Sequence, residues 1–127
     1  MELVVDLKLL PANKEALWES IKAERDRRIQ TGGYQAAGKW FHSDTFSRTQ
    51  QMGLVMMGAS IPLGLQWKTM DGSFITMTQT LAGQVFAAAA ASDAALFARA
   101  EQIKATMDAD PVAFDLAAHA WPVVFGE

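Results

Sequence analysis

Residues 66–77 hold the clearest alternation of apolar and polar positions in the chain. Asp71-Gly72 lies at its centre, and these residue types best tolerate the positive φ angles of a type I′ turn. The resulting two-residue loop places Trp67 and Phe74 on the same face and leaves large apolar side chains on both faces. Because a two-stranded ribbon is marginal alone, we expect helices to cover this hairpin.

A second hairpin is predicted over residues 34–42, where two short runs flank Ala36-Ala37-Gly38. Three-residue hairpin loops commonly end in a glycine with a left-handed backbone. The sequence therefore predicts two antiparallel hairpins, either separate or joined in one small antiparallel sheet.

Three to four helices are predicted around these hairpins, over residues 12–29, 44–57, 79–107 and 111–119. Apolar residues at helical spacing indicate the first three, and a cap followed by proline indicates the last. Gly32-Gly33 is expected to end the first helix. The start signals are Pro11, Ser43 or Asp44, Thr78, and Asp110-Pro111.

The helix over residues 79–107 is rich in alanine and long for a chain of this size. At 1.5 Å per residue it would extend about 42 Å, so part of it could serve an oligomer contact. Ser92-Asp93 could cap a second helix, which leaves open one helix or two with a kink. The expected buried row is Leu81, Val85, Ala88, Ala89, Ser92, Leu96, Ala100, Ile103 and Met107, flanked by Phe86 and Phe97.

The helix over residues 44–57 carries a methionine-rich apolar stripe. Phe46, Gly53 and Met57 share one line along it, with Met56 beside them. Methionine fills irregular gaps, so this stripe is more typical of core packing than of a binding groove. Met52 and Val55 lie nearby.

Length and composition indicate one α+β domain over residues 1–127, with residues 1–20 as a variable N-terminal arm and 21–122 as the core. Residues 3–10 are expected to form a short strand or an extended arm.

With no cysteine, the chain has no disulfide scaffold, thiol nucleophile or cysteine-based metal site. A net charge of −3 gives no reason to expect nucleic acid as a partner. The apolar run 52–65 is too short and too broken to span a bilayer, so no membrane partner is expected.

Few side chains could carry chemistry. Only His42 and His119 could act as acid or base near neutral pH. Ser43 and Asp44 follow His42 directly, but catalytic triads are assembled from distant segments, and capping explains both residues better. The spacing of the two histidines suggests no third metal ligand. We therefore expect no catalytic, cofactor or metal site.

Several residues are candidates for contact with a partner. The arginines near the end of the first helix either complement the negative end of its dipole or bind phosphate. The apolar tail must pack on this domain or on a partner, and four tryptophans could line a sugar surface but fit an apolar core better. The candidates are Trp18, Arg25, Arg27, Arg28, Val123, Val124 and Phe125.

Several motifs between residues 21 and 107 occur in an order that resembles a known family. They are Ile21-Lys22-Ala23-Glu24-Arg25-Asp26-Arg27-Arg28-Ile29, Gly32-Gly33, Gly38-Lys39-Trp40-Phe41-His42-Ser43-Asp44 and Gln66-Trp67-Lys68-Thr69-Met70-Asp71-Gly72. The chain is similar to the domain of unknown function DUF4376, found in small phage tail-associated proteins. The resemblance implies a phage or prophage tail gene near tail-fibre genes and carries no assigned catalytic residues.

The expected function is therefore a non-enzymatic structural component at a tail fibre or baseplate, acting through protein–protein contacts as a homo-oligomer. It would assemble in the host cytoplasm and then reside in the virion tail. The alternative is an assembly chaperone for the tail fibre that is absent from the mature virion. A distant third is a glycan-binding or glycan-hydrolysing fibre accessory, and hydrolysis would require two carboxylates converging in one cleft.

Overall fold

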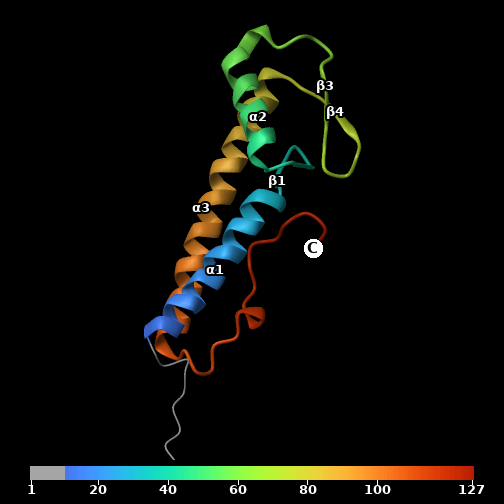
Figure 1. Ribbon diagram of the computed structural model, residues 1–127. Helices are drawn as coiled ribbons and strands as arrows, with labels where there is room; N and C mark the ends of the chain where they lie inside the picture. The colour runs from blue at the N-terminus through green and yellow to red at the C-terminus, as the bar shows by residue number, and fades with distance from the viewer. Residues whose placement is uncertain (1–10) are drawn as a thin grey trace, which may run out of the picture.

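The computed structural model describes residues 11–127 and confirms an α+β fold with three α-helices and two hairpins (Figure 1). The strand or arm predicted over residues 3–10 lies outside the described residues. The elements in order are α1 (Pro11–Thr31), β1 (Tyr34–Ala36), β2 (Lys39–Phe41), α2 (Thr45–Met57), the one-turn 3₁₀ helix η2 (Gly58–Ser60), β3 (Gln66–Lys68), β4 (Phe74–Thr76), α3 (Gln79–Ala109) and the one-turn 3₁₀ helix η3 (Leu116–Ala118).

Helix α3 is one unbroken helix of 31 residues, about 46 Å long at 1.5 Å per residue. Thr78 caps its start, because the Leu81 N–H donates to the Thr78 hydroxyl at 3.1 Å. Asp93 does not start a second helix, since its carboxylate pairs with Arg48 of α2 at 2.7 Å. The predicted stripe is largely confirmed by the buried residues, which are Leu81, Ala82, Val85, Leu96, Ala100, Ile103 and Met107.

Helices α1 and α2 lie end to end along α3 and run antiparallel to it, with the first hairpin at their junction (Figure 1). This arrangement makes a rod two helices thick, with two hydrophobic clusters along its length. The cluster around α2 consists of Tyr34, Phe41, Leu54, Met77, Leu81, Ala82 and Val85. The cluster beneath α1 consists of Ile21, Ala100, Ile103, Met107 and Phe114.

Two glycines end α1 and allow three segments to meet closely. Gly33 has a φ of +73°, and a Cβ added there would lie 2.9 Å from the Phe41 carbonyl oxygen and 2.2 Å from the Met70 sulfur. A Cβ at Gly32 would lie 2.5 Å from a Val124 methyl carbon. The predicted glycine stop is therefore confirmed, and it also creates the space in which both hairpins and the C-terminal segment converge.

The first hairpin has a shorter loop than predicted. Ala36 pairs with Lys39, so only Ala37 and Gly38 form the loop. Their φ angles are +51° and +75°, the two positive values of a type I′ turn. The three-residue prediction is wrong because Ala37 accepts a left-handed backbone, which is uncommon for a residue with a Cβ.

The second hairpin has a longer loop than predicted, so its register shifts by one residue. Trp67 pairs with Ile75 and Lys68 with Phe74. Asp71 prevents the two-residue loop, since its carboxylate accepts from the Ser73 N–H and from the Thr69 hydroxyl, each at 2.8 Å. The one-residue shift exchanges the faces: Trp67 and Ile75 face the core, whereas Lys68 and Phe74 face outward.

The hairpins form two separate two-stranded sheets rather than one joined sheet. One backbone hydrogen bond links them, from the Met70 N–H to the Trp40 carbonyl at 2.9 Å. The Lys39 ammonium adds a second link, because it donates to the Ser73 hydroxyl at 2.8 Å and to Asp71 at 3.2 Å.

Helix α2 begins as predicted but buries a different face. The Asp44 carboxylate accepts from the Ser47 N–H and caps the helix, which runs to Met57. Its buried residues are Gln51 and Leu54. The interpretation of its methionine-rich stripe as core is wrong, because all the large apolar residues apart from Leu54 are exposed: Phe46, Met52, Val55, Met56 and Met57.

The C-terminal segment returns along α1 instead of forming the helix predicted over residues 111–119 (Figure 1). The Asp110 carboxylate accepts a hydrogen bond from the Ala113 N–H at 3.3 Å, but no helix follows. Asp115 caps the single turn of η3. The segment instead buries Phe114 in the cluster beneath α1 and packs Leu116 and Trp121 against it, an arrangement that follows α1 as an extended chain. We call residues 110–127 the C-terminal strap.

Candidate functional site

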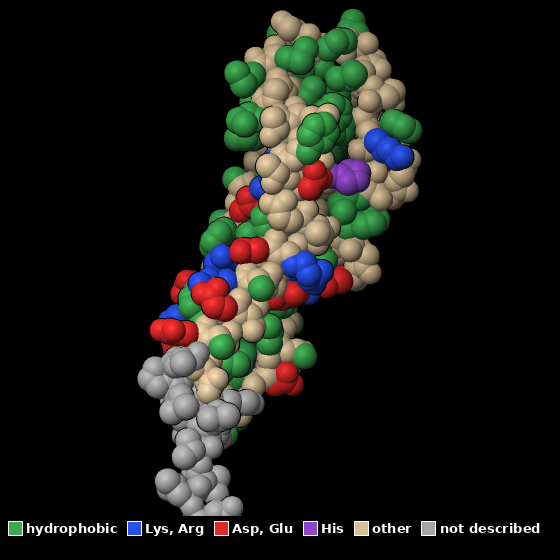
Figure 2. Space-filling model, in the orientation of Figure 1, with side chains coloured by type: hydrophobic (Ala, Val, Ile, Leu, Met, Phe, Trp, Pro, Cys, Tyr) green, Lys and Arg blue, Asp and Glu red, His purple; other side chains and the backbone are tan. Residues whose placement is uncertain are grey.

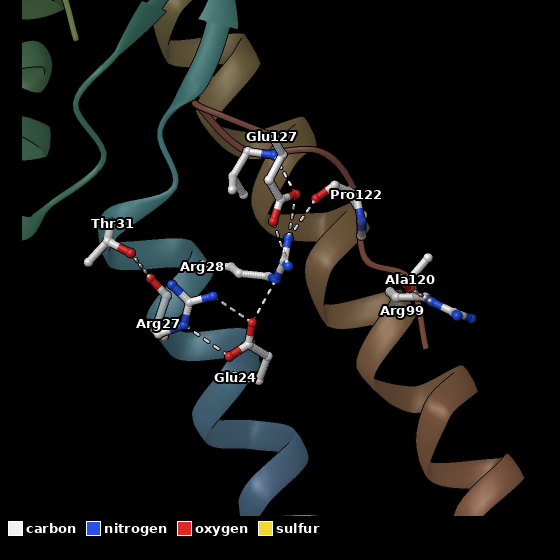
Figure 3. A network of polar contacts seen from close by, with 9 residues as sticks. Glu24, Arg27, Arg28, Thr31, Arg99, Ala120, Pro122 and Glu127 are labelled. Carbon is white, nitrogen blue, oxygen red and sulfur yellow. Dashed lines mark hydrogen bonds and ion pairs between the residues drawn. The ribbon is translucent and has the colours of Figure 1, made fainter. Parts of the chain in front are cut away.

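Arg28 of α1 holds the C-terminal strap, and the neighbouring arginines bind residues of the helices (Figure 3). Arg28 donates to Glu24 and to Glu127, each at 2.9 Å, and to the Pro122 carbonyl at 3.2 Å. Arg27 pairs with Glu24 at 2.7 Å. The guanidinium of Arg25 lies 4.3 Å from the Phe97 ring centroid, within cation–π range. All three candidate arginines are therefore engaged within their own chain.

Electrostatics keeps these pairs ionised near neutral pH. The hydrogen bond from Arg27, helped by Arg28, holds the pKa of Glu24 below its usual value. The hydrogen bond from Arg28 lowers the pKa of Glu127 in the same way. The cluster is thus charge-compensated, which favours a structural role over a phosphate site. We call Glu24, Arg27, Arg28 and Glu127 the arginine clasp.

The apolar tail packs on this domain. Val124 lies against Gly32, and the Phe125 N–H donates to the Gly32 carbonyl at 2.9 Å. The ring of Phe125 lies 6.4 Å from that of Trp40. Val123 is 64% exposed and Phe125 38% exposed, so a partner contact stays a prediction for these two residues.

Trp18 lies on α1 where this helix packs against α3. It packs on the cluster beneath α1, and the ammonium groups of Lys22 and Lys104 lie 5.5 Å and 5.6 Å from its ring centroid. Its ring is half-buried between the two lysines. A contact with a partner stays a prediction for this residue.

A polar network joins the four segments that meet at the middle of the rod. Arg48 of α2 bridges Asp93 of α3 and the Ile29 carbonyl of α1. Tyr34 donates to the Gln51 side chain, and burial raises the pKa of its hydroxyl. Ser43 accepts the Gly33 N–H at 2.9 Å, so this serine has a structural role.

The residues considered for catalysis or metal binding do not converge. His119 stacks on Phe114 with ring centroids 5.3 Å apart, whereas His42 lies beside β3. Among residues 11–127, the structure contains no group of three His, Asp or Glu side chains placed to hold a metal ion.

A groove of about 510 Å³ between α1 and the strap contains two carboxylates, Glu24 and Asp115, beside Trp121. General acid catalysis of glycoside hydrolysis needs a carboxyl group with a raised pKa. The pKa of Glu24 is lowered instead, by its arginine partners. Asp115 accepts the Ala117 N–H at 3.1 Å. Both carboxylates thus have structural partners, and this groove gives hydrolysis no support.

The outer face of α2 and the adjoining part of α3 expose large apolar side chains, among them Met52, Met56 and Phe86. A groove of about 340 Å³ runs between the two helices, with the Arg48–Asp93 ion pair among its lining residues. Met52, Phe86 and two alanines line it together with Thr45, Thr49 and Gln51. Exposed apolar side chains gather at this end of the rod (Figure 2). We call this the α2–α3 surface and define it by Met52, Val55, Met56, Phe86, Ala89 and Ala90.

Charge is absent from this region of the sequence. Residues 49–67 and 72–92 contain no Asp, Glu, Lys or Arg. Methionine is a side chain that adapts to irregular partner surfaces. By length and composition alone, α3 is also apolar enough to cross a membrane, and 22% of its most apolar window is buried. The α2–α3 surface can bind by apolar packing and offers no reactive group.

The comparison with family models identifies the chain. The model of DUF4376, a domain of unknown function, matches residues 12–118. The chain belongs to the DUF4376 family. No curated protein and no solved structure matches it. The family match covers all of α1, α2 and α3 except Pro11. It therefore includes the α2–α3 surface and the arginines of α1, but not Pro122 and Glu127, which Arg28 binds on the strap.

Sequence reasoning missed this surface for a physical reason. An apolar stripe shows that a helix face avoids water, but it does not show whether the same chain covers that face. A usable signal was present, because the last six residues of α2 are all uncharged, five apolar side chains and one glycine, and they occupy every side of the helix: Met52, Gly53, Leu54, Val55, Met56 and Met57. A helix needs only one face to pack on the core of its own chain, so apolar residues on its other faces indicate exposed surface.

Proposed function

We propose that this protein is a non-enzymatic component of a bacteriophage or prophage tail that acts through protein–protein contacts. It would occupy a position at the tail fibre or baseplate and assemble in the host cytoplasm. The phage context comes from the family resemblance described above. The observation that carries the mode of action is the uncharged, exposed α2–α3 surface.

The distribution of charge supports a contact at this end of the rod. The other half carries the arginine clasp, whose cations are paired with carboxylates of the same chain. At the α2–α3 surface, Met56 is 82% exposed and Met52 and Phe86 are about half exposed. Contiguous apolar patches of this kind commonly mark protein–protein contacts.

A second candidate is an assembly chaperone that binds a tail fibre during folding and then leaves. The observation that favours it is the exposure of three methionines on α2, at positions 52, 56 and 57. Flexible methionine surfaces can repack against different partners, as a transient binder of folding chains requires.

Mass spectrometry of purified particles tests the proposal. We expect the wild-type protein at fixed stoichiometry to the fibre or baseplate proteins, and loss of incorporation for Met56→Glu. Ala105→Glu places the same charge at an exposed position of α3 in the other half of the rod, and this control should be incorporated normally. Absence of the protein from particles, with co-purification with the fibre in infected cells, would favour the chaperone. Absence from both would refute a tail role.

A further inference from the structure

A cavity of about 320 Å³ lies between the first half of α2 and the second hairpin. It shares no lining residue with the α2–α3 surface, and its volume falls in the range of small-molecule sites, about 300–1,000 Å³. Helix α2 contributes Ser47 and Gln50 to the lining, strand β3 contributes Gln66 and Trp67, and His42 comes from the segment between β2 and α2. The cavity therefore joins three separate parts of the fold.

Polar side chains of this cavity carry hydrogen-bonding groups that the chain itself does not use. Within residues 11–127, the structure gives no hydrogen bond to the His42 imidazole, the Gln50 amide or the Trp67 indole N–H. A glutamine amide both donates and accepts, a neutral imidazole has one nitrogen for each, and the indole N–H donates. A sugar hydroxyl group also donates and accepts, so a ligand rich in hydroxyl groups matches this lining.

Two aromatic rings supply the apolar part of the lining. Trp67 packs on the cluster around α2 and also borders the cavity. Phe74 of β4 is 59% exposed, because the shifted register turns it outward beside its cross-strand partner, Lys68. The face of an aromatic ring carries partial negative charge, and the C–H groups of a pyranose ring, polarised by their oxygens, pack against such a face. Rings beside amides thus match the C–H face and the hydroxyl edge of a sugar.

Charge narrows the class of sugar. Lys68 is the only Lys, Arg, Asp or Glu among the described lining residues, and its ammonium makes no ion pair or hydrogen bond with residues 11–127. The Asp44 carboxylate near His42 caps α2 instead, because it accepts from the Ser47 N–H at 3.1 Å and from the Ser47 hydroxyl at 2.7 Å. The cavity therefore presents one uncompensated positive charge, which favours a ligand with one carboxylate.

We propose that this cavity binds an acidic sugar, a pyranose that carries one carboxylate, such as a uronic acid. The C–H face of the sugar lies on Phe74 and Trp67, its hydroxyl groups bond to Gln50 and His42, and its carboxylate accepts a hydrogen bond from the Lys68 ammonium. The inference goes beyond the proposed function, because the site uses none of the residues of the α2–α3 surface. The described lining has no carboxyl group, so it gives glycoside hydrolysis no support.

Two other classes of ligand match the lining less well. An apolar ligand would leave the imidazole, amide and indole groups covered but without hydrogen-bond partners, which is costly. A phosphate or sulfate is usually bound by several cations or by a free helix N-terminus. Here Lys68 is alone, and the start of α2 already has the Asp44 carboxylate as its cap.

A nuclear magnetic resonance titration of the full-length protein tests the inference, with the Trp67 indole N–H as the reporter and Trp67→Phe to assign its signal. The probes are methyl β-D-glucuronide, methyl β-D-glucoside, in which a hydroxymethyl group replaces the carboxylate, and sodium acetate, which has the carboxylate without the ring. We expect the glucuronide to shift the signal with a dissociation constant on the order of 1 mM, as for other ligands of this size. The glucoside should bind about tenfold more weakly, and acetate should leave the signal unchanged at the same concentrations.

Matched variants locate the ligand. Lys68→Met should reduce the affinity for the glucuronide to that for the glucoside, and Phe74→Ala should weaken both sugars at least about fivefold. As controls, Phe46→Ala removes a ring that is 72% exposed outside the cavity, and Lys104→Met removes a lysine from the other half of the rod. Both controls should bind like the wild type. Circular dichroism must show that each variant stays folded, as expected for side chains at the surface.

Several results would overturn the inference. One is a Trp67 signal that moves with neither sugar. Another is equal affinity for the two sugars, or a preference for the glucuronide that survives Lys68→Met, since the charge would then have no role. An effect of acetate equal to that of the glucuronide would show a simple anion site. Binding that Phe74→Ala leaves unchanged would place the sugar elsewhere on the molecule.

Discussion

Gly33 is the position at which one methyl group should do most damage to this fold. Its φ of +73° is left-handed, which costs a residue with a Cβ about 1–2 kcal/mol. The added carbon would also lie 2.9 Å from the Phe41 carbonyl oxygen and 2.2 Å from the Met70 sulfur. The Met70 side chain can move, but the Phe41 carbonyl belongs to a strand. Overpacking of this kind costs about 1–3 kcal/mol.

Gly38 provides the matched control, because its φ is +75° but no atom lies within 4 Å of the added carbon. Gly38→Ala should therefore lose only the backbone contribution, about 1 kcal/mol, and Gly33→Ala about 3 kcal/mol in total. Urea denaturation measures both free energies of unfolding. In a domain of this size the two variants should melt about 4 °C and 12 °C below the wild type.

The double variant Gly33→Ala, Met70→Ala separates the two contacts at Gly33. It should lose the sulfur clash but keep the 2.9 Å approach to the Phe41 carbonyl, in addition to the cost of truncating Met70. Equal losses for Gly33→Ala and Gly38→Ala would refute the reasoning, because they would show that the junction of the hairpins is loose enough to admit a side chain.

Three further predictions concern charge and turns. The pKa values of Glu24 and Glu127 are lowered in the folded state. Their contribution to stability is therefore complete above about pH 4.5 and is lost as the pH falls through the folded pKa values. Thermal melts should show that Arg28→Gln loses less stability than the wild type between pH 5 and 3. Burial raises the pKa of Tyr34, the only tyrosine, so a spectroscopic titration should show ionisation above pH 10 in folded protein and near 10 in urea, with stability falling as the pH rises through that interval. Ala37→Asn should raise the free energy of unfolding by about 0.5–1 kcal/mol, because asparagine tolerates the left-handed φ of +51° better; no gain would mean that this turn is unstrained.

Local signals in the sequence predict the elements of this fold well where one residue decides the outcome. Asp44 and Thr78 cap α2 and α3 because each side chain needs only the N–H three residues ahead. The buried row of α3 follows from periodicity alone, since a helix that touches two others must bury one continuous stripe. Gly33 ends α1 because its backbone must turn left-handed.

The hairpin registers were not predictable from turn residues alone. Asp71-Gly72 indicates a two-residue loop only if the Asp71 carboxylate makes no hydrogen bonds within the turn. Here it accepts hydrogen bonds from Thr69 and Ser73. In the first hairpin, Ala37 takes the position that asparagine or glycine would normally hold. The loop of the second hairpin also contacts the first, because the Met70 N–H donates to the Trp40 carbonyl, and turn residues alone do not encode a contact between hairpins.

An apolar segment in a sequence does not show whether its own chain covers it, as the strap and the α2–α3 surface illustrate. A tail such as Val123-Val124-Phe125 indicates only that something must cover it, and the close approach at Gly32 lets α1 do so. The stripe on α2 carries the same signal, yet no segment among residues 11–127 lies over Met56. One half of the rod thus supplies its own cover through Arg28, and the other half exposes an uncharged face. The sequence signal for burial is therefore met within the chain at the strap, and at Met56 of α2 it is not.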